Sequence, residues 1–405
     1  MRLKFLFAFA AGLLFYSNTY AQGNKSAPAV YSIDASTLMA NKTKIKKRDV
    51  ALMPAYQQLL QDAEKALLFK PVSVMEKINF PPSGDKHDYM SIAPYFWPDS
   101  TKPGGSPYIN RDGLRNPEEL QYKDKIYLAA LCDAVTTLSL AWYFSEDVRY
   151  ADHATKLMRV WFLDTATKMN PNLNFAQAVK GRETGRGYGL IDTRHFVKLV
   201  DAIGLLKGAH SWSSGDQAGM QDWFASFLDW MQTSKNGKDE MNTTNNHGVW
   251  YDQQRLSYAL FTGKTELAKQ IVASAESRLD KQMDDQGGFP LEMKRTISLH
   301  YTVFIMDPFF TIAQMAQNIH IDLWNYESPS HKSLKKGLNA LVPYLLEEKK
   351  WEGPQILQFD FEEAVPLLLT GAQKYQCESC KKRITQILGE KAKSSRLHLL
   401  TAVDF

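Results

Sequence analysis

Apolar residues recur at every third or fourth position through most of the chain after residue 123. Within residues 124–144, for example, Ile126, Leu128, Leu131 and Val135 follow this spacing, which is typical of an amphipathic helix. Alternating patterns that would indicate strands are scarce. The same spacing predicts further helices over residues 149–163, 194–209, 216–232, 248–261, 266–283, 301–317, 333–346 and 362–375.

Predicted helices of this length, joined by short polar breaks, are typical of stacked helical hairpins. We therefore expect an all-α fold, an α/α toroid in which the hairpins form an incomplete barrel and long irregular loops line a cleft. An open solenoid is the alternative. We expect residues 22–405 to form a single catalytic domain of this kind.

Two long stretches break the helical pattern. They cover residues 81–119 and 170–192, and they are rich in aromatic residues and arginine. Long irregular segments inside compact domains are usually functional or disordered, and the aromatic content disfavours disorder. Both stretches are therefore candidates for the walls of a binding site.

The first residues are typical of a secretory signal. Arg2 and Lys4 precede a short apolar run, and small residues follow it at Thr19-Tyr20-Ala21. We expect residues 1–21 to be a signal peptide that is removed before Gln22, with the mature chain exported and, in a bacterial cell, periplasmic. No later stretch indicates a transmembrane helix, and no cysteine indicates a lipid anchor.

Charge and cysteines limit the possible partners. The net charge of +4 is too small to indicate nucleic acid as a partner. Of the three cysteines, Cys377 and Cys380 form a single CESC pair, for which a local disulfide or unpaired thiols are better interpretations than a zinc or redox site. The histidines show no metal-ligand spacing. We expect no cofactor, no metal and no membrane anchor, and a monomer.

The stretch NTTNNHGVWYD, residues 242–252, places amides and an imidazole at the start of a predicted helix. Helix capping would account for Asn242, Thr243 or Thr244, because their side-chain oxygens accept the free amide protons of a first turn. It leaves Asn246 and His247 unexplained. Arg295 and Tyr301 lie at the start of a second apolar helix.

These four side chains suit the cleavage of a uronic-acid polymer by β-elimination. Removal of the C5 proton builds negative charge on the neighbouring carboxylate, which amides or cations must neutralise. A base must take the proton, and an acid must protonate the leaving O4. Where proton and leaving oxygen lie on one face of the sugar, as in mannuronate or glucuronate, one tyrosine can do both. In guluronate they lie on opposite faces, and a second group such as histidine must take one role.

At these residues the sequence resembles the alginate lyase family of polysaccharide lyases, which are built on α/α toroids. The resemblance rests on NNHGVWYD, on RTISLHYTVF and, more diffusely, on SIAPYFWPD with YINRDGLRNPE. It implies a catalytic set of Asn246, His247, Arg295 and Tyr301. Tyrosine is the proton shuttle in that family, Asn and Arg neutralise the carboxylate, and His assists there or acts as base. The implied substrate is an anionic polysaccharide, either mannuronate-rich alginate or glucuronan.

Aromatic and arginine side chains of the irregular stretches are candidates for holding such a polymer, because aromatic faces stack on sugar rings and Arg binds carboxylates bidentately. Packing within the domain is the competing explanation for each. Tyr251, four residues after His247, would either orient the imidazole or pack. The candidate substrate-binding residues are Tyr95, Trp97, Arg111, Asn174, Gln177, Arg186, Arg194 and Tyr251.

Two other functions remain open from the residues alone. A glycoside hydrolase needs two carboxylates flanking the scissile bond, and no pair stands out among its candidates. A non-catalytic glycan-binding protein would keep the aromatic and arginine residues but would not need Tyr301 beside an Asn-His pair. The candidate acids for a hydrolase are Asp88, Asp99, Asp112, Glu183 and Asp192.

Overall fold

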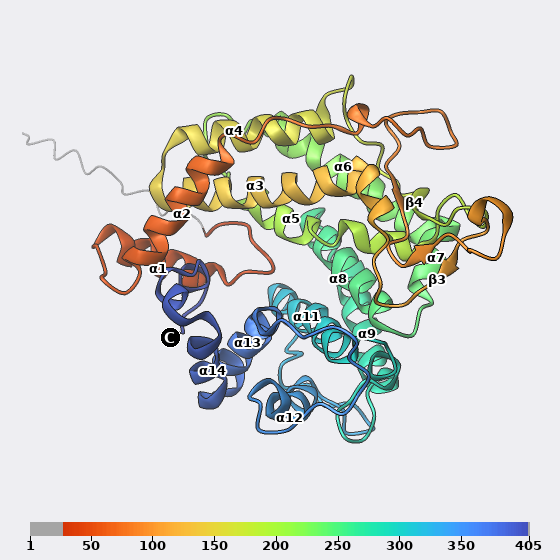
Figure 1. Cartoon of the computed structure of the whole chain (residues 1–405). Helices are drawn as coiled ribbons and strands as arrows, with labels where there is room; N and C mark the ends of the chain where they lie inside the picture. The colour runs from red at the N-terminus through yellow and green to blue at the C-terminus, as the bar shows by residue number, and fades with distance from the viewer. Residues whose placement is uncertain (1–26, 404–405) are drawn as a thin grey trace, which may run out of the picture.

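The computed structural model describes residues 27–403 and is mainly helical (Figure 1). The predicted signal peptide, residues 1–21, lies outside the described residues, so its removal stays a prediction. The helices are α1 (Ala35–Lys46), α2 (Met53–Ala66), α3 (Lys123–Ser145), α4 (Val148–Met158), α5 (Phe196–Leu205), α6 (Ser214–Thr233), α7 (Lys235–Met241), α8 (Asn246–Phe261), α9 (Thr265–Gln282), α10 (Pro290–Met293), α11 (Ser298–Ala316), α12 (Leu334–Leu345), α13 (Val365–Tyr375), α14 (Glu378–Leu388) and α15 (Leu397–Leu400).

Consecutive helices form hairpins because polar residues and left-handed positions end one helix and begin the next. Glu146 closes α3 with φ 62°, and the side chain of Asp147 then accepts the amide proton of Arg149 at the start of α4. Between α8 and α9, Gly263 has φ 70°, which glycine adopts without a Cβ clash. Each turn brings the apolar faces of two successive helices together.

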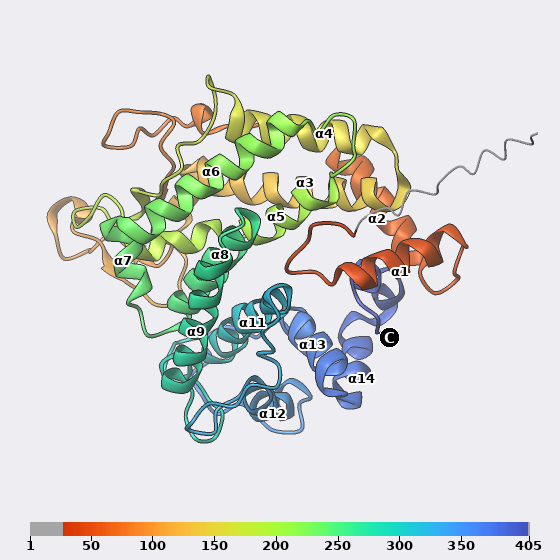
Figure 2. The ribbon, with the colours of Figure 1, turned by 180° about the vertical axis from the view of Figure 1, so that it is seen from behind.

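The hairpins are arranged around a ring (Figures 1 and 2). Helices α3, α5, α8, α11 and α13 each contact the next and form the inner layer. Helices α4, α9, α12 and α14 pack behind α3, α8, α11 and α13. One hydrophobic cluster, from Val30 to Leu399, lies between the layers. The predicted α/α toroid is confirmed.

The two ends of the described chain meet and join the ring. Helix α1 contacts α15, and the Nδ2 of Asn41 donates to the backbone carbonyls of His398, Leu399 and Thr401 at 3.1, 3.2 and 3.0 Å. Farther along the ring, Asp201 of α5 accepts the backbone N–H of Tyr31 at 2.6 Å. Both contacts hold the N-terminal segment against helices from distant parts of the sequence.

Helix α3 corrects one expectation from the sequence. It is 23 residues long with a mean hydropathy of 1.4 over its most apolar window, so its length and composition suit a membrane span, which we did not predict. In the structure 56% of that window is buried, and the helix packs against α2, α4 and α5. Packing inside the domain accounts for its apolar composition.

The two irregular stretches lie side by side and pair through short strands. Strand β1 (Met90–Ile92) of the first runs parallel to β4 (Phe175–Ala178) of the second, and the first stretch also folds on itself through the antiparallel strands β2 (Phe96–Trp97) and β3 (Ile109–Asn110). Short 3₁₀ turns complete the chain: η1 (Val74–Glu76), η2 (Pro103–Gly105), η3 (Pro117–Gln121), η5 (Gly187–Thr193), η6 (Gln317–Ile319), η7 (Phe361–Ala364) and η8 (Gly389–Ser394), with a π turn, η4 (Arg159–Leu163).

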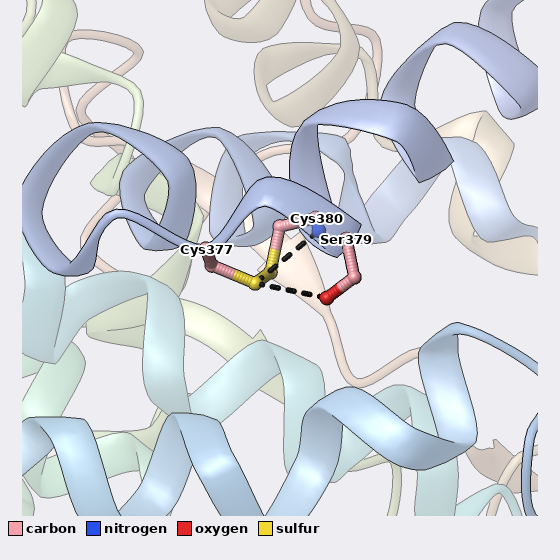
Figure 3. Close-up of a disulfide and its surroundings, with 3 residues drawn as sticks. All are labelled: Cys377, Ser379 and Cys380. Carbon is pink, nitrogen blue, oxygen red and sulfur yellow. Dashed lines mark hydrogen bonds between the residues drawn. A yellow bond between two sulfur atoms is a disulfide. The ribbon is translucent and has the colours of Figure 1, made fainter.

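Cys377 and Cys380 form a disulfide at the start of α14 (Figure 3), one of the two states that the sequence left open. The Sγ of Cys377 also accepts the backbone N–H of Cys380 at 3.2 Å, as the N-cap of the helix. Cys132 is a buried free thiol in α3.

Candidate active site

Asn246 is the first residue of α8 and is held by a buried glutamate. The N-cap before it is Asn245, whose side chain accepts the backbone N–H of His247 at 3.2 Å. The sequence had suggested Asn242, Thr243 or Thr244 as the capping residue of this helix, and none of them is its N-cap. The backbone N–H and the Nδ2 of Asn246 both donate to Glu292 of α10, at 2.7 and 2.8 Å. Asn246 is fully buried, and its Oδ1 has no hydrogen-bond partner among the described residues.

Glu292 is only 1% exposed. Burial raises its pKa, and the hydrogen bonds from Asn246 and the charges of Arg295 and His247 oppose that rise. The carboxylate thus has neighbours that favour its ionised form and an environment that favours its protonated form.

His247 is held in a similar way by a second buried glutamate. Its Nδ1 lies 2.6 Å from Oε1 of Glu240, which is on α7 and 1% exposed, and its ring contacts the edge of Tyr188 at 4.4 Å between centroids. A carboxylate at Nδ1 fixes both the orientation and the tautomer of an imidazole. The Nε2 is left without a hydrogen-bond partner in the described part of the chain and is the atom available for chemistry.

Arg295 lies in the turn between α10 and α11. Its Nε contacts both carboxylate oxygens of Asp112 at 3.1 and 3.0 Å, and its Nη2 also bonds to Asp112. The backbone N–H of Thr296 donates to the same carboxylate at 3.1 Å. Burial would raise the pKa of Asp112, but Arg295 and Thr296 hold it below its usual value. Asp112 therefore fixes the guanidinium of Arg295 by binding the Nε and Nη2 of that group.

The guanidinium lies 3.6 Å from the centroid of the Tyr301 ring, so the cation stacks on the ring. Tyr301 is on the first turns of α11, is 6% exposed, and its hydroxyl donates to the hydroxyl of Tyr95 at 3.1 Å. The pKa of Tyr301 lies above its usual value, because burial and the nearby Tyr95 raise it by more than Arg295 lowers it. A tyrosine in contact with a fixed cation is suited to proton transfer.

Contacts link the four sequence-predicted residues, which come from distant parts of the chain, through Glu292 and Arg295. Glu292 of α10 binds Asn246 of α8, and Arg295 follows three residues after Glu292 and stacks on Tyr301 of α11. Spacing along the chain alone did not establish that the Asn-His pair and Tyr301 meet.

The aromatic and arginine residues of the irregular stretches form the adjoining wall. Arg186 lies between the rings of Phe96 and Tyr188, at 4.9 and 5.0 Å, so it connects β2 with the ring that contacts His247. Arg111 is exposed over the ring of Trp97 at 5.5 Å. The structure therefore places Tyr95, Trp97, Arg111 and Arg186 in one continuous region with the four central residues.

Gln177 is 5% exposed, and both ends of its amide are engaged within the protein. Its Nε2 donates to Asp192, and its Oε1 accepts from Arg186, both at 3.1 Å. Asp192 is itself buried; burial would raise its pKa, but Lys125, Ser91 and Gln177 hold it below its usual value. In this structure Gln177 positions Arg186 and is held by Asp192 in turn.

No side-chain hydrogen bond, ion pair or ring contact within the described residues joins three further candidates to the four central residues. Asn174 is exposed, and its Oδ1 accepts the indole N–H of Trp230 at 3.0 Å. Arg194 lines a cavity of about 640 Å³ inside the ring, whose lining includes none of the four central residues. Tyr251 is fully buried, and its hydroxyl donates to the carbonyl of Met231 at 2.9 Å, so it packs against α6 and does not orient the imidazole.

The candidate acids for a hydrolase are mostly engaged in the structure. Asp112 binds Arg295, Asp192 is enclosed, and Asp88 accepts from Asn170 at 2.9 Å. The residues that sequence reasoning missed are Glu240, Glu292 and Tyr188. Single glutamates in short helices such as α7 and α10 carry no sequence signal that distinguishes them from solvated residues.

Comparison with known proteins relates the chain to one family. The family model described as Alginate lyase matches residues 73–351. Similarity to a solved structure extends over most of the chain: the crystal structure of an alginate lyase from Bacteroides ovatus has 38% sequence identity and a TM-score of 0.87, covering 92% of this chain and 98% of that one. No curated protein is matched.

More distant solved structures share the fold. A histidine variant of alginate lyase A1-III complexed with a tetrasaccharide has 17% identity and a TM-score of 0.57, covering 90% of this chain and 93% of that one. Alginate lyase A1-III from Sphingomonas species A1 has 16% identity and a TM-score of 0.52, with coverage of 87% and 88%.

Proposed function

Because the chain belongs to the alginate lyase family, we propose that it cleaves mannuronate-rich alginate by β-elimination and leaves a 4,5-unsaturated uronate at the new chain end. The family assignment makes the protein a polysaccharide lyase, a carbon–oxygen lyase that acts on alginate. The preferred polymer, the elimination mechanism and the roles of individual residues are the proposal.

The first requirement of the reaction is to neutralise the uronate carboxylate, because charge builds on it as the C5 proton leaves. Arg295, the amide of Asn246 and a cationic His247, whose Nε2–H donates, supply that neutralisation. Asp112 fixes Arg295 and Glu240 fixes His247, so these groups need little reorganisation when charge develops.

The second requirement is proton transfer, for which Tyr301 is the candidate. As phenolate it takes the C5 proton, and as phenol it returns a proton to the leaving O4. Burial disfavours the phenolate and the stacked guanidinium of Arg295 favours it. Both steps on one oxygen require that proton and leaving group lie on one face of the sugar, as they do in mannuronate.

The observation that carries this proposal is a chain of contacts. Glu292 binds Asn246 and interacts with the charges of Arg295 and His247, and Arg295 stacks on Tyr301. Glucuronan is the second candidate polymer, because glucuronate has the same relation between C5–H and O4. Guluronate would require a second proton-transfer group on the opposite face, and His247 is the candidate for that role.

The experiment is to incubate purified protein with polymannuronate, polyguluronate and glucuronan and to follow the ultraviolet absorbance of the conjugated product. Wild-type protein should produce absorbance fastest with polymannuronate, and Tyr301→Phe should abolish it. Tyr326→Phe, a partly buried tyrosine near Asp280, is the matched control and should retain activity. New reducing ends without absorbance would show hydrolysis and reject the elimination mechanism.

We also propose that the mature chain is exported to the periplasm and acts as a monomer. The apolar N-terminal run and the Cys377–Cys380 disulfide support export, because disulfides persist in oxidising compartments. Cell fractionation with N-terminal sequencing tests export and the cleavage before Gln22. Size-exclusion chromatography with light scattering measures the molar mass in solution and so tests whether the protein is a monomer.

A further inference from the structure

The side chain of Asn246 has the wrong polarity for its proposed role. Its Nδ2 and its backbone N–H are both bonded to Glu292, so the atom left without a partner among the described residues is the acceptor Oδ1. An acceptor repels the carboxylate of a uronate, which needs donors. A buried polar atom without a partner is also unfavourable, and such atoms in native proteins call for an explanation.

A proton on Glu292 reverses this polarity without moving any heavy atom far. The two ends of an Asn amide have nearly the same shape, so a half-turn about the side-chain bond exchanges Oδ1 and Nδ2. Protonated Glu292 then donates from its Oε2 to Oδ1, while its Oε1 still accepts the backbone N–H of Asn246. Both N–H groups of Nδ2 become free to donate to a carboxylate.

We propose that Glu292 is a positioning residue for Asn246, and that binding of a uronate carboxylate is coupled to proton uptake by Glu292 and to a half-turn of the Asn246 amide. This inference rests on the proposed function. The proton comes from solvent, and no covalent bond to carbon forms or breaks. Asn246 is fully buried, so a contact with substrate requires a local rearrangement at this side chain in any case.

The surroundings of Glu292 act in opposite directions on its protonation. Burial favours its protonated form, whereas Arg295 in the following turn and His247 on α8 favour the ionised form. Asp112 binds Arg295 and Glu240 binds His247, so both carboxylates weaken the effect of these two groups on Glu292. Tyr301 of α11 is stacked on Arg295. The negative charge of an arriving uronate acts in the same direction as burial.

Isothermal titration calorimetry tests the proposal directly. A saturated mannuronate oligosaccharide is titrated into Tyr301→Phe, which binds without turnover, at one pH in buffers of different ionisation enthalpy. We expect net proton uptake on binding. In Tyr301→Phe with Glu292→Gln the uptake should disappear while binding remains, because the introduced amide donates to Oδ1 permanently and its oxygen accepts the backbone N–H. Glu276→Gln on α9, where burial also raises the pKa, is the control and should leave the uptake unchanged.

Kinetics separates this role from a general structural one. Glu292→Leu removes the partner of Asn246 and should lower kcat/KM by roughly a hundredfold, the usual effect of losing one charge-stabilising donor. Glu292→Gln should retain most of the activity that Glu292→Leu loses. Because binding of the wild-type protein takes up a proton, its KM should rise as the pH increases, whereas the KM of Glu292→Gln should not. Binding without proton uptake, or Glu292→Gln as impaired as Glu292→Leu, would overturn the inference and leave the lyase assignment intact. Absence of binding to any uronate oligosaccharide would overturn the proposed function and this inference together.

Discussion

The guanidinium carbon of Arg295 lies 3.6 Å from the centroid of the Tyr301 ring, and the same guanidinium is bound by Asp112. One cation is therefore shared between a carboxylate and the tyrosine proposed to move protons. Each of these two groups changes how far the cation stabilises the other. Burial has the largest effect on the pKa of Tyr301 and raises it, while Arg295 lowers the pKa and Asp112 raises it.

Removing the charge of Asp112 should make Tyr301 easier to ionise. In Asp112→Asn the cation is no longer neutralised, and Asp112 itself raises the pKa of Tyr301. We expect the acid limb of the kcat/KM profile to move to lower pH by about one unit, the usual effect of a neighbouring charge. The measurement is the pH–rate profile on polymannuronate.

Asp99→Asn is the control for this prediction, because Asp99 lies in the same irregular stretch and its side chain bonds within its own turn, to Thr101. It should leave the profile in place. A shift of the acid limb to higher pH in a folded Asp112→Asn protein would contradict a phenolate stabilised by Arg295.

Glu240 should matter for catalysis although it does not contact substrate. Glu240→Gln removes the charge that fixes His247, and the amide can present an N–H to Nδ1 in place of an acceptor. We expect kcat/KM to fall by roughly 10- to 100-fold, the range found for residues that orient a functional histidine. Steady-state kinetics measures the change in kcat/KM, and thermal unfolding checks that the variant is folded.

The neighbouring Asp239 offers a matched control on the same helix. It is exposed and pairs with Lys235 at 2.6 Å. Asp239→Asn should retain wild-type kinetics. If Glu240→Gln also does so, the carboxylate has no role in orienting the imidazole.

Much of the fold follows from periodicity, since long helices with an apolar stripe are recognised in sequence. Helices α8 and α11 begin two and three residues before the predicted starts. The pattern missed α1, α2, α7, α10, α14 and α15. Helix α7, KNGKDEM, is short and polar and has no apolar stripe, yet it carries Glu240.

The candidate site could be predicted only in part for the same physical reason. Asn246, His247, Arg295 and Tyr301 lie in motifs, whereas Glu292 becomes their neighbour through packing of α10 against the start of α8, 46 residues away in sequence. Tyr251 shows that spacing along the sequence can also suggest a contact that does not form. Its spacing of four from His247 is a helical repeat, but burial against α6 decides where its side chain points.

Arg111 should contribute to binding and little to chemistry. It is exposed over Trp97, and no ion pair within the described residues engages it. We expect Arg111→Ala to raise KM about three- to tenfold with kcat nearly unchanged, equivalent to about 1 kcal/mol for an exposed charge contact. The effect should weaken as salt is added, because exposed charges are screened.

Arg149→Ala is the control. Arg149 also lies over an aromatic ring, that of Tyr150 at 5.4 Å, but it forms ion pairs with Asp147, which precedes α4, and with Glu64 of α2. It should leave KM unchanged. An equal effect of both substitutions would point to loss of net charge alone.

Asp201 should make stability depend on pH between about 4 and 6. Burial raises its pKa to about 6, although Ser32 and the backbone N–H groups of Tyr31 and Ser32 donate to it. The folded chain therefore holds a proton that the unfolded chain has already released in this range. The resulting stability is fully present below the unfolded pKa of about 3.9 and is lost as pH rises through 6, a total change of about 3 kcal/mol.

Urea unfolding of wild-type protein and Asp201→Asn at several pH values measures this contribution. The amide does not titrate, so the stability difference between the two proteins should change by about 2 kcal/mol between pH 4 and pH 6 and stay constant above pH 7. The hydrogen bonds of Asp201 hold the segment at Tyr31 against α5, so the N-terminal segment should also exchange its amide protons faster in the variant. A stability difference that does not vary between pH 4 and pH 6 would mean that Asp201 is ionised in the folded protein throughout this range.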